Sequence, residues 1–389
     1  MTAVLAERAA EVLAAAQQLL TKRMGSTVKL ADPVELGAGR RTVVLRVRVV
    51  ENTYSLPRTV ILKQINGSAY EVLNRGTDAR GASVLASAFV REAVCYQFAT
   101  SLAPANRPGP ELLAHDVESR LLVLSDLGDE RQMTSLLRTA DENAVTNVLM
   151  AQAQALGRMH AATVGREDDF IALARRADMD RHDELAEQAE ASVHAVAPLL
   201  RQQIGIEVPS DILAMVERCS LLFAGGRLRA FSPSDLCPDN IIVNGEGVRF
   251  LDYEWGGFRD ATLDIAETLV SFPGCLCDYN LSADRARWMI EAWRAEVVGM
   301  WPQLADDNLL RRKILDAQLI WVWLSTFWYL PDNNPRLAEV REHGLSVRRS
   351  VALPRRWRSL ATFAARVGEE KLAAFADTVA DAFDAKWVG

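Results

Sequence analysis

The sequence predicts an α+β fold with two lobes, an N-terminal lobe built on an antiparallel β-sheet and a larger, mainly helical C-terminal lobe. The chain has 389 residues, which is more than one typical domain holds. Strand-like segments gather before residue 125, whereas most segments after residue 142 have the apolar spacing of helices. All 9 tryptophans lie within residues 255–387, so we expect the second lobe to contain the larger aromatic core.

The N-terminal lobe, residues 1–124, begins with an Ala-rich amphipathic helix over residues 3–24. Apolar and polar side chains then alternate from residue 43, as they do in a half-buried strand. The polar, glycine-containing residues 66–83 predict a loop, and residues 84–102 predict a helix. The expected strands are residues 43–49, 60–63, 112–117 and 121–124.

Residues 125–129 are expected to form a hinge, and residues 130–389 the helical lobe. One β-hairpin interrupts the helices, because two strand-like segments, 241–243 and 248–251, flank the turn signal Asn244-Gly245-Glu246-Gly247. The expected helices are residues 142–163, 184–204, 209–224, 284–299, 308–329 and 356–386.

Composition limits the classes of protein and partner. Apolar residues make up 49% and charged residues 24%, which is typical of globular proteins and excludes disorder and coiled coil. A net charge of −7 is unfavourable for nucleic acid, so we expect no nucleic-acid partner. No apolar stretch approaches the roughly 20 residues that span a bilayer, and the first thirty residues have no signal peptide. We therefore expect no membrane partner and a cytoplasmic location, and the oligomeric state stays unknown.

The five cysteines are too few and too irregularly spaced to predict a disulfide framework. Cys275-x-Cys277 has no second Cys or His pair nearby that would complete a zinc site. We therefore expect reduced thiols in a reducing compartment and no metal at this dipeptide.

The strongest signal for chemistry flanks the predicted hairpin. Asp235 and Asn240 precede it on one loop, and Asp252 follows its second strand. A hairpin brings its ends together, so Asn240 and Asp252 are expected to lie close and to offer the oxygen ligands that Mg²⁺ prefers. Asp235 can accept a proton from an attacking hydroxyl. Each of the three is also common as a loop or cap residue, so the signal lies in the combination.

The N-terminal lobe adds weaker signals. Gly37 and Gly39 form a Gly-rich turn whose backbone N–H groups can approach phosphate, although such a turn is usually only a turn. Lys63 ends an apolar strand and needs a partner or a ligand unless it points to water at a sheet edge. Glu92 lies on the following helix, where a glutamate is normally solvated.

Taken in this order, the residues resemble the protein-kinase-like superfamily, and more closely its aminoglycoside phosphotransferase and choline kinase branch. The resemblance covers roughly residues 30–270 and implies a protein-kinase-like bilobal fold. It implies a Mg²⁺-dependent enzyme that transfers the γ-phosphate of ATP or GTP to a hydroxyl of a small molecule, such as an aminoglycoside or other antibiotic, an amino alcohol or a sugar.

The resemblance also implies residue roles. The glycines match the phosphate-covering loop, Lys63 the lysine that holds the α- and β-phosphates, and Glu92 its orienting partner. Asp235 matches the catalytic aspartate, and Asn240 and Asp252 match the metal ligands. Asp264 matches a structural aspartate of the branch, and Leu156 to His160 match the end of a helix before the catalytic loop. Ser125 and Leu127 match the adenine-contacting hinge.

The acceptor site is expected between the catalytic loop and the C-terminal helices. Its candidate acidic residues, which are otherwise cap or solvated-face residues, are Glu254, Asp260, Glu267 and Asp278. An aromatic cluster on one predicted helix favours core packing over cation–π recognition of an ammonium group. It consists of Trp321, Trp323, Phe327 and Trp328.

One departure from the branch keeps an alternative open. The chain has Pro233-Ser234 where the branch usually has His-Gly before the catalytic aspartate. A catalytically silent, kinase-like nucleotide-binding module is therefore the alternative to the enzyme. A protein kinase is a third hypothesis, disfavoured because the chain has Asp252-Tyr253-Glu254 rather than Asp-Phe-Gly and lacks an Ala-Pro-Glu segment.

Overall fold

The computed structural model describes residues 3–38, 42–51, 56–65, 80–128, 130–180, 183–334, 336–337 and 342–388. The chain divides into two compact units. Unit 1 comprises residues 1–129, 168–181 and 252–256, and unit 2 comprises residues 130–167, 182–251 and 257–389. Two short segments from the range expected for the helical lobe, 168–181 and 252–256, thus pack within unit 1.

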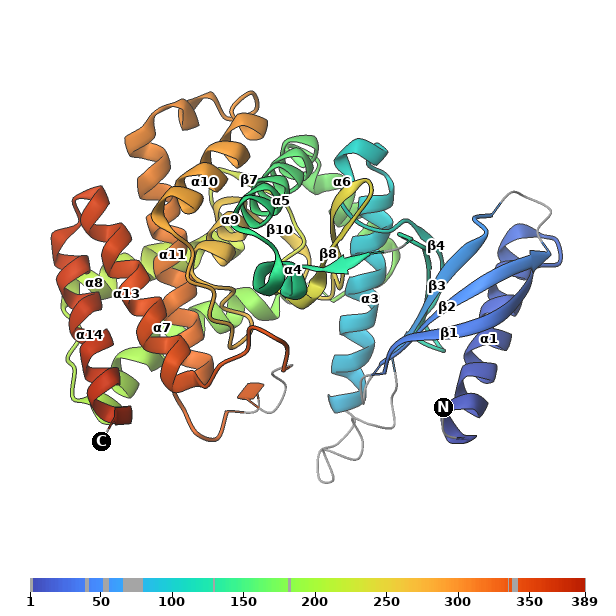
Figure 1. Ribbon diagram of the computed structural model, residues 1–389, viewed down its shortest axis with the longest axis horizontal. Coiled ribbons are helices and arrows are strands. Elements are labelled where there is room, and N and C mark those ends of the chain that lie inside the picture. Colours follow the sequence, from blue (N-terminus) through green and yellow to red (C-terminus); the bar gives the residue numbers. More distant parts are fainter. Residues whose placement is uncertain are drawn as a thin grey trace. The chain divides into compact units, whose positions relative to one another are not determined.

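Unit 1 is built on a five-stranded sheet in the order β1-β2-β3-β5-β4, with every neighbouring pair antiparallel (Figure 1). The predicted antiparallel sheet is confirmed, and it gains a first strand that the sequence analysis did not delimit. Its strands are β1 (Lys29–Ala38), β2 (Thr42–Glu51), β3 (Thr59–Ile65), β4 (Leu112–Asp116) and β5 (Leu121–Ser125).

Two long helices belong to this unit, α1 (Ala3–Met24) and α3 (Arg80–Thr100). The apolar stripe of α1 packs on one face of the sheet, where it shares a core with Val60 and Leu62 of β3. Because side chains alternate along a strand, Lys63 points to the opposite face. The expected loop over residues 66–83 lies outside the described residues up to 79, and its last four residues already belong to α3.

Unit 2 contains the predicted hairpin, formed by β8 (Ile241–Asn244) and β9 (Gly247–Phe250), with β6 (Arg131–Gln132) beside β8. Gly247 has φ +114°, a conformation that a residue with a Cβ rarely adopts, so the glycine is required to close the turn. A second, two-stranded sheet pairs β7 (Arg229–Ser232) with β10 (Gly257–Asp260).

The rest of unit 2 is helical. Helix α11 is its centre and contacts α7, α8, α9 and α13 (Figure 1). Trp321, Trp323 and Trp328 on this helix are each at most 2% exposed, which confirms core packing. The helices are α4 (Met133–Thr139), α5 (Glu142–Thr163), α7 (Glu184–Ile204), α8 (Ser210–Ala224), α9 (Thr262–Leu269), α10 (Ala283–Val297), α11 (Asp307–Tyr329), α13 (Arg349–Val367) and α14 (Glu370–Val388). Helix α6 (Glu167–Arg176) belongs almost wholly to unit 1.

The single helix expected over residues 356–386 is wrong, because the structure has two helices, α13 and α14, in this region. Gly368 ends α13 in the left-handed conformation, with φ +84°, and its N–H caps the last turn. A glycine at this position is the usual helix C-terminal signal, which the continuous apolar periodicity on both sides obscured.

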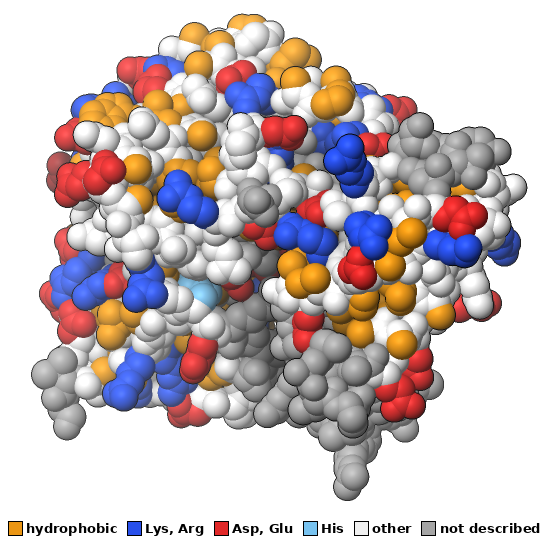
Figure 2. Space-filling view, turned by 45° about the vertical axis from the view of Figure 1, so that its right-hand side comes forward, with side chains coloured by type: hydrophobic (Ala, Val, Ile, Leu, Met, Phe, Trp, Pro, Cys, Tyr) orange, Lys and Arg blue, Asp and Glu red, His pale blue; other side chains and the backbone are white. Residues whose placement is uncertain are grey.

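Within the part of the chain that the structure describes, no helix is both long and apolar enough to cross a membrane. On the face that Figure 2 shows, Lys and Arg side chains are interspersed with Asp and Glu side chains. This mixture of signs on the described surface fits the modest net charge of −7.

Candidate functional site

The candidate site in unit 1 centres on Lys63, whose side chain is only 9% exposed. Its Nζ lies 2.7 Å from Glu92 Oε1 and 2.6 Å from Asp252 Oδ1. Glu254 Oε2 is a more distant neighbour, at 3.9 Å. Three carboxylates therefore face one ammonium group, and this excess of negative charge leaves room for a further cation.

Helix α3 places two of these groups. Glu92 is fully buried on α3 and faces the sheet side that Lys63 points to. One turn further along, the Tyr96 hydroxyl accepts a hydrogen bond of 3.0 Å from the backbone N–H of Asp252. The Tyr253 ring stacks on the Tyr96 ring with centroids 4.7 Å apart. Asp252 itself has φ +57°, so a strained backbone turns its carboxylate toward Lys63.

Charge and burial compete in this cluster. Burial by itself lowers the pKa of Lys63, but the Asp252 and Glu92 carboxylates outweigh it and hold that pKa above its usual value. Lys63 is therefore a cation at any physiological pH. Burial also raises the pKa of Glu92 to about 7, against the opposing effect of Lys63.

The segment expected to form a hinge begins at Ser125, the last residue of β5. Ser125 is bonded to Glu111 through both its backbone N–H and its hydroxyl, at 2.9 and 2.8 Å. Asp126 forms an ion pair with Arg46 of β2 at 2.8 Å and accepts from the Gly128 N–H at 3.0 Å. Leu127 between them is half-buried.

These bonds fix the backbone of the segment that the resemblance assigns to adenine. Of the glycine-rich turn, Gly37 lies at the end of β1 opposite Val44, and Gly39 lies outside the described residues.

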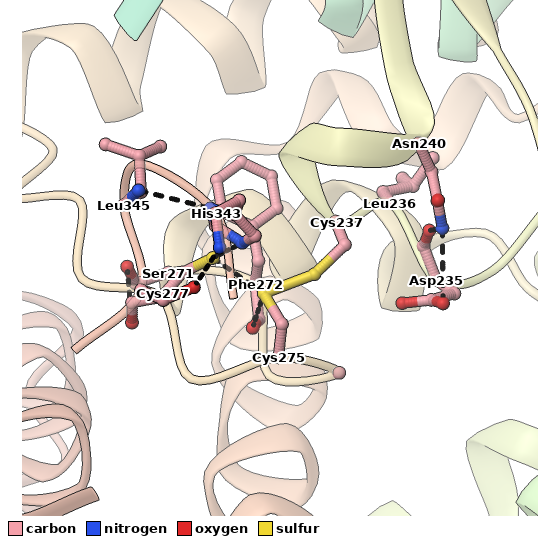
Figure 3. The surroundings of a disulfide bond; sticks show 12 residues. Asp235, Leu236, Cys237, Asn240, Ser271, Phe272, Cys275, Cys277, His343 and Leu345 are labelled. Carbon is pink, nitrogen blue, oxygen red and sulfur yellow. Dashed lines mark hydrogen bonds between the residues drawn. A yellow bond between two sulfur atoms is a disulfide. The ribbon is translucent and has the colours of Figure 1, made fainter. Parts of the chain in front are cut away.

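In unit 2, Asp235 lies on the loop between β7 and the 3₁₀ turn η2 (Pro238–Asn240). Asn240 Nδ2 donates to the Asp235 backbone oxygen at 3.0 Å and to its carboxylate at 3.2 Å (Figure 3). With its amide nitrogen engaged in this way, Asn240 keeps its side-chain oxygen as an acceptor, which is the atom that a hard cation would bind.

Asn240 also connects this loop to the hairpin. Its carbonyl accepts from the Leu251 N–H at 2.9 Å, and Leu251 is the residue that precedes Asp252. The expected proximity of the Asn240 and Asp252 side chains stays a prediction.

A buried hydrogen-bond network lies next to the loop of Asp235. Asp264 accepts from His160 Nε2 at 2.9 Å and from the Ser232 hydroxyl at 2.6 Å. The Trp293 indole N–H donates to His160 Nδ1 at 3.0 Å, which leaves the ring proton on Nε2, facing Asp264. The network therefore joins the end of α5 at His160 to Asp264 of α9 and to Ser232, which precedes the loop of Asp235.

Ser234 extends the network to a second buried charge. Its hydroxyl lies 2.8 Å from the Ser232 hydroxyl and accepts from Arg259 at 2.8 Å. Arg259 also donates to both carboxylate oxygens of Asp183 at 3.0 Å. Ser234 and Asp235 both have φ near +50°, so the hydroxyl bonds of Ser234 stabilise a strained turn. The Pro233-Ser234 sequence is thus integrated into the support of the loop.

The acidic residues considered for an acceptor differ in exposure. Asp260 and Glu267 are each 1% exposed, so a dissolved acceptor does not reach them. Asp260 accepts from the Thr262 hydroxyl at 2.6 Å and from the Thr262 backbone N–H at 3.2 Å, at the start of α9. Glu267 accepts at 3.2 Å from the backbone N–H of Leu236, the residue that follows Asp235 in the chain. Asp278 is paired with Arg355, which leaves Glu254, with 31% of its side chain exposed, as the accessible candidate.

The loop of Asp235 has a second close neighbour that the sequence did not indicate. A Cβ at Gly274 would lie 2.7 Å from Asp235 Oδ1, so the segment between α9 and α10 comes very near to the Asp235 carboxylate. The Tyr329 hydroxyl holds this segment by donating to the Gly274 carbonyl at 2.8 Å. The Phe-Pro-Gly-Cys sequence around Gly274 gives a turn signal but no hint of its partner.

The cysteines also depart from expectation. Cys237 and Cys275 are joined as a disulfide, and Cys277 and His343 lie against it (Figure 3). The donors come from segments 38 and 66 residues apart in the chain, so sequence spacing could not reveal the group.

Comparisons with known proteins give distant structural likenesses. No protein-family model matches the chain, and neither does any curated protein. A choline/ethanolamine kinase family protein from Mesorhizobium loti is 14% identical, with 90% of this chain and 93% of that chain covered and a TM-score of 0.48. The choline kinase of Streptococcus pneumoniae is 11% identical, with 88% and 98% covered and a TM-score of 0.45.

An aminoglycoside phosphotransferase from Alicyclobacillus acidocaldarius is 12% identical, with 92% and 93% covered and a TM-score of 0.41. These neighbours carry the names of the branch that the sequence resembles.

Replacing Gly274 tests the close approach to Asp235. Gly274→Ala is expected to destabilise the protein by about 1 kcal/mol, because the added methyl displaces the Asp235 carboxylate from its hydrogen bond with Asn240. Gly299→Ala is the matched control, since a Cβ there meets nothing within 4 Å. Urea denaturation measures both variants. Equal transition midpoints would contradict the described approach of the two loops.

The pH dependence of stability tests Glu267. Burial raises its pKa well above the usual value, so the folded protein keeps a proton that the unfolded chain releases. The stabilisation from Glu267 is therefore complete below the ordinary glutamate pKa and is lost as pH rises above it, by at most about 1.4 kcal/mol per pH unit.

Glu267→Gln removes this dependence, so the variant is expected to gain stability relative to the wild type between pH 5 and pH 8. Urea denaturation at several pH values measures the difference. A difference that does not change with pH would mean that Glu267 is ionised in the folded protein.

Proposed function

We propose that the chain is a small-molecule kinase that transfers the γ-phosphate of ATP or GTP to a hydroxyl group, with Mg²⁺ as the cation. The observation that carries this proposal is the buried Lys63 in contact with Glu92 and Asp252. Burying a lysine against carboxylates costs desolvation energy that a purely apolar cluster would avoid, so retaining the charges favours a functional role.

Phosphoryl transfer needs positioning and charge neutralisation more than covalent chemistry from the protein. We assign the nucleotide phosphates to Lys63, which Glu92 orients, and the adenine to the segment of Ser125 and Leu127. Asn240 and Asp252 would hold Mg²⁺, which supplies charge neutralisation on the phosphate oxygens. The carboxamide oxygen and the carboxylate are the ligand types that this ion prefers.

Asp235 is the proposed catalytic residue. Its carboxylate aligns the acceptor hydroxyl and takes the proton as the new oxygen–phosphorus bond forms and the bond to the ADP leaving group breaks. A carboxylate is a weak base, which suffices because the loose transition state of phosphoryl transfer needs little deprotonation beforehand. The bonds from Asn240 support this role, because they hold the carboxylate in one orientation.

The acceptor is proposed only by class: an alcohol on a small molecule such as an aminoglycoside, an amino alcohol or a sugar. Glu254 is the one candidate acidic residue with substantial exposure, and it would pair with a cationic group on the acceptor. Asp260 and Glu267 are not part of this proposal, because both are buried.

Release of ADP tests the enzyme against a silent nucleotide-binding module. The purified chain is incubated with Mg-ATP or Mg-GTP and a panel of aminoglycosides, choline, amino alcohols and sugars, and ADP or GDP is measured. We expect acceptor-dependent turnover with at least one compound, and Asp235→Asn is expected to lower kcat more than tenfold while nucleotide still binds.

Asp211→Asn is the matched control for Asp235→Asn, because Asp211 lies on the surface of α8 and pairs with Lys371. It is expected to keep full turnover. Nucleotide binding without turnover on any acceptor would favour the silent module, and unchanged turnover in Asp235→Asn would remove Asp235 from its role.

Lys63→Met tests the phosphate contact. The variant loses the ammonium group, so its affinity for Mg-AMP-PNP by isothermal titration is expected to fall at least tenfold. Lys371→Met is the control, since the Lys371 side chain is 84% exposed. Folding of both variants is checked by circular dichroism, because an unpaired buried Glu92 costs about 3–5 kcal/mol. A folded Lys63→Met protein with unchanged affinity would contradict the assignment.

A further inference from the structure

Four metal-ligating side chains converge behind the catalytic loop in unit 2. Their donor atoms all lie within 4.8 Å of one another. Cys277 Sγ is 2.6 Å from Cys275 Sγ and 2.9 Å from His343 Nε2 (Figure 3). We call this group the Cys₃His cluster; it consists of Cys237, Cys275, Cys277 and His343.

A disulfide accounts for only half of this cluster. It joins Cys237 to Cys275 and leaves the third sulfur and the imidazole gathered against it without a covalent role. A metal ion uses all four donors at once. Tetrahedral zinc with Zn–S bonds of about 2.3 Å places its sulfurs about 3.8 Å apart. The sulfurs of Cys275 and Cys277 lie 2.6 Å apart in the disulfide-bonded arrangement, so zinc binding would move them apart by about 1 Å.

The environment is that of a closed structural site. The three cysteines are each at most 5% exposed, and only His343 is partly exposed. Four protein ligands leave no open position for a substrate, as in structural rather than catalytic zinc sites.

A buried positive charge lies beside the sulfurs. Arg356 is 1% exposed and donates to the backbone carbonyls of Phe272 and Cys277, at 3.2 and 3.4 Å. Among the described residues, no ion pair joins Arg356 to a carboxylate. Three thiolates and one Zn²⁺ carry a net charge of −1, which would balance the guanidinium.

Zinc binding requires a change of tautomer at His343. His343 Nδ1 accepts from the Leu345 N–H at 3.1 Å, so the ring proton now lies on Nε2 and points to Cys277. Coordination through Nε2 moves that proton to Nδ1 and opens the contact with Leu345. This change is confined to the short turn of residues 343–346. The His343 backbone N–H donates to the Ser346 hydroxyl at 2.9 Å, and this bond does not involve the imidazole, so it can hold the turn in either state.

We propose that the Cys₃His cluster binds one structural Zn²⁺ that fixes the catalytic loop. Cys237 lies two residues after Asp235, and Cys275 follows Gly274, whose backbone approaches the Asp235 carboxylate. The ion would therefore tie together the two segments that border Asp235 and anchor both to the segment of His343. The site forms once a cellular thiol such as glutathione or a dithiol has reduced the Cys237–Cys275 disulfide, a two-electron step that yields two thiols and oxidises the reductant to its own disulfide. Zinc then displaces the protons of the three thiols to solvent, with no further redox change.

Metal content and free thiols of the full-length chain test the proposal. The protein is purified anaerobically under reducing conditions, and zinc is measured by mass spectrometry. We expect about one Zn²⁺ per chain. For protein purified anaerobically without reductant, denaturation with a chelator is expected to release all 5 cysteines as free thiols, whereas a disulfide would leave 3. Replacement of zinc by Co²⁺ is expected to give the thiolate charge-transfer and tetrahedral d–d absorption bands.

Cys277→Ser separates the two chemistries, because it removes a zinc ligand and leaves the disulfide partners intact. Its zinc content is expected to fall at least tenfold. Cys219→Ser is the control, since Cys219 is a buried free thiol of α8 outside the cluster, and it is expected to keep its zinc.

A wild-type chain that takes up neither zinc nor Co²⁺ after reduction, and that shows three free thiols after purification in air, would overturn the proposal. So would full zinc content in Cys277→Ser. If Cys277→Ser does not fold, the metal content and thiol count of the wild type decide the question alone.

Discussion

The ammonium group of Lys63, held between the carboxylates of Glu92 and Asp252, is the interaction on which unit 1 depends. It brings together a strand, a helix and a segment that lies 189 residues later in the chain than Lys63. Removing Lys63 would leave the Glu92 and Asp252 carboxylates close together without their cation, which is far more costly than losing a surface ion pair. The alternation of β3 and the contact of Tyr96 with the 252–256 segment both serve this arrangement.

In unit 2, the strained backbone at Asp235 also requires stabilising contacts from its surroundings. Hydrogen bonds between buried polar groups rigidify their surroundings, and such bonds join Asp264, Ser232, Ser234 and Arg259. A closed metal site on the other side of the same loop would add a second constraint from Cys237. The strained turn is thus stabilised from two directions, by hydrogen bonds through Ser234 and by the cysteine-bearing segments.

How much the sequence could predict depends on how local each signal is. The alternation in β2, the Asn-Gly turn of the β8–β9 hairpin and the long amphipathic helices are local patterns, and the structure has them. Strand β10 and helix α9 were missed because they have only 4 and 8 residues, too few to establish a period, and because their polar residues are buried together with the apolar ones. Asp260 and Glu267 were considered for an exposed acceptor site because their side chains are acidic. The fold buries both residues, which the sequence alone does not reveal.

The residues around the site also fall into two groups, those that a pattern along the chain reveals and those that only the fold brings together. Lys63, Glu92 and Asp252 were found because an order of residue types along the chain is visible in a sequence. The approach of Gly274 to Asp235 and the gathering of the Cys₃His cluster arise from contacts between distant segments, which no spacing rule describes. The segment of His343 is joined to that of Cys277 by backbone bonds such as the one from the Val347 N–H to the Leu276 carbonyl, at 2.8 Å.

A crystal structure of the chain with Mg²⁺ and a non-hydrolysable ATP analogue tests the central claim most directly. The account predicts that Lys63 contacts the α- and β-phosphates and that Asn240 and Asp252 share one Mg²⁺, with the Asp235 carboxylate facing the γ-phosphate. A nucleotide bound elsewhere, or a cation held without Asn240 and Asp252, would contradict it.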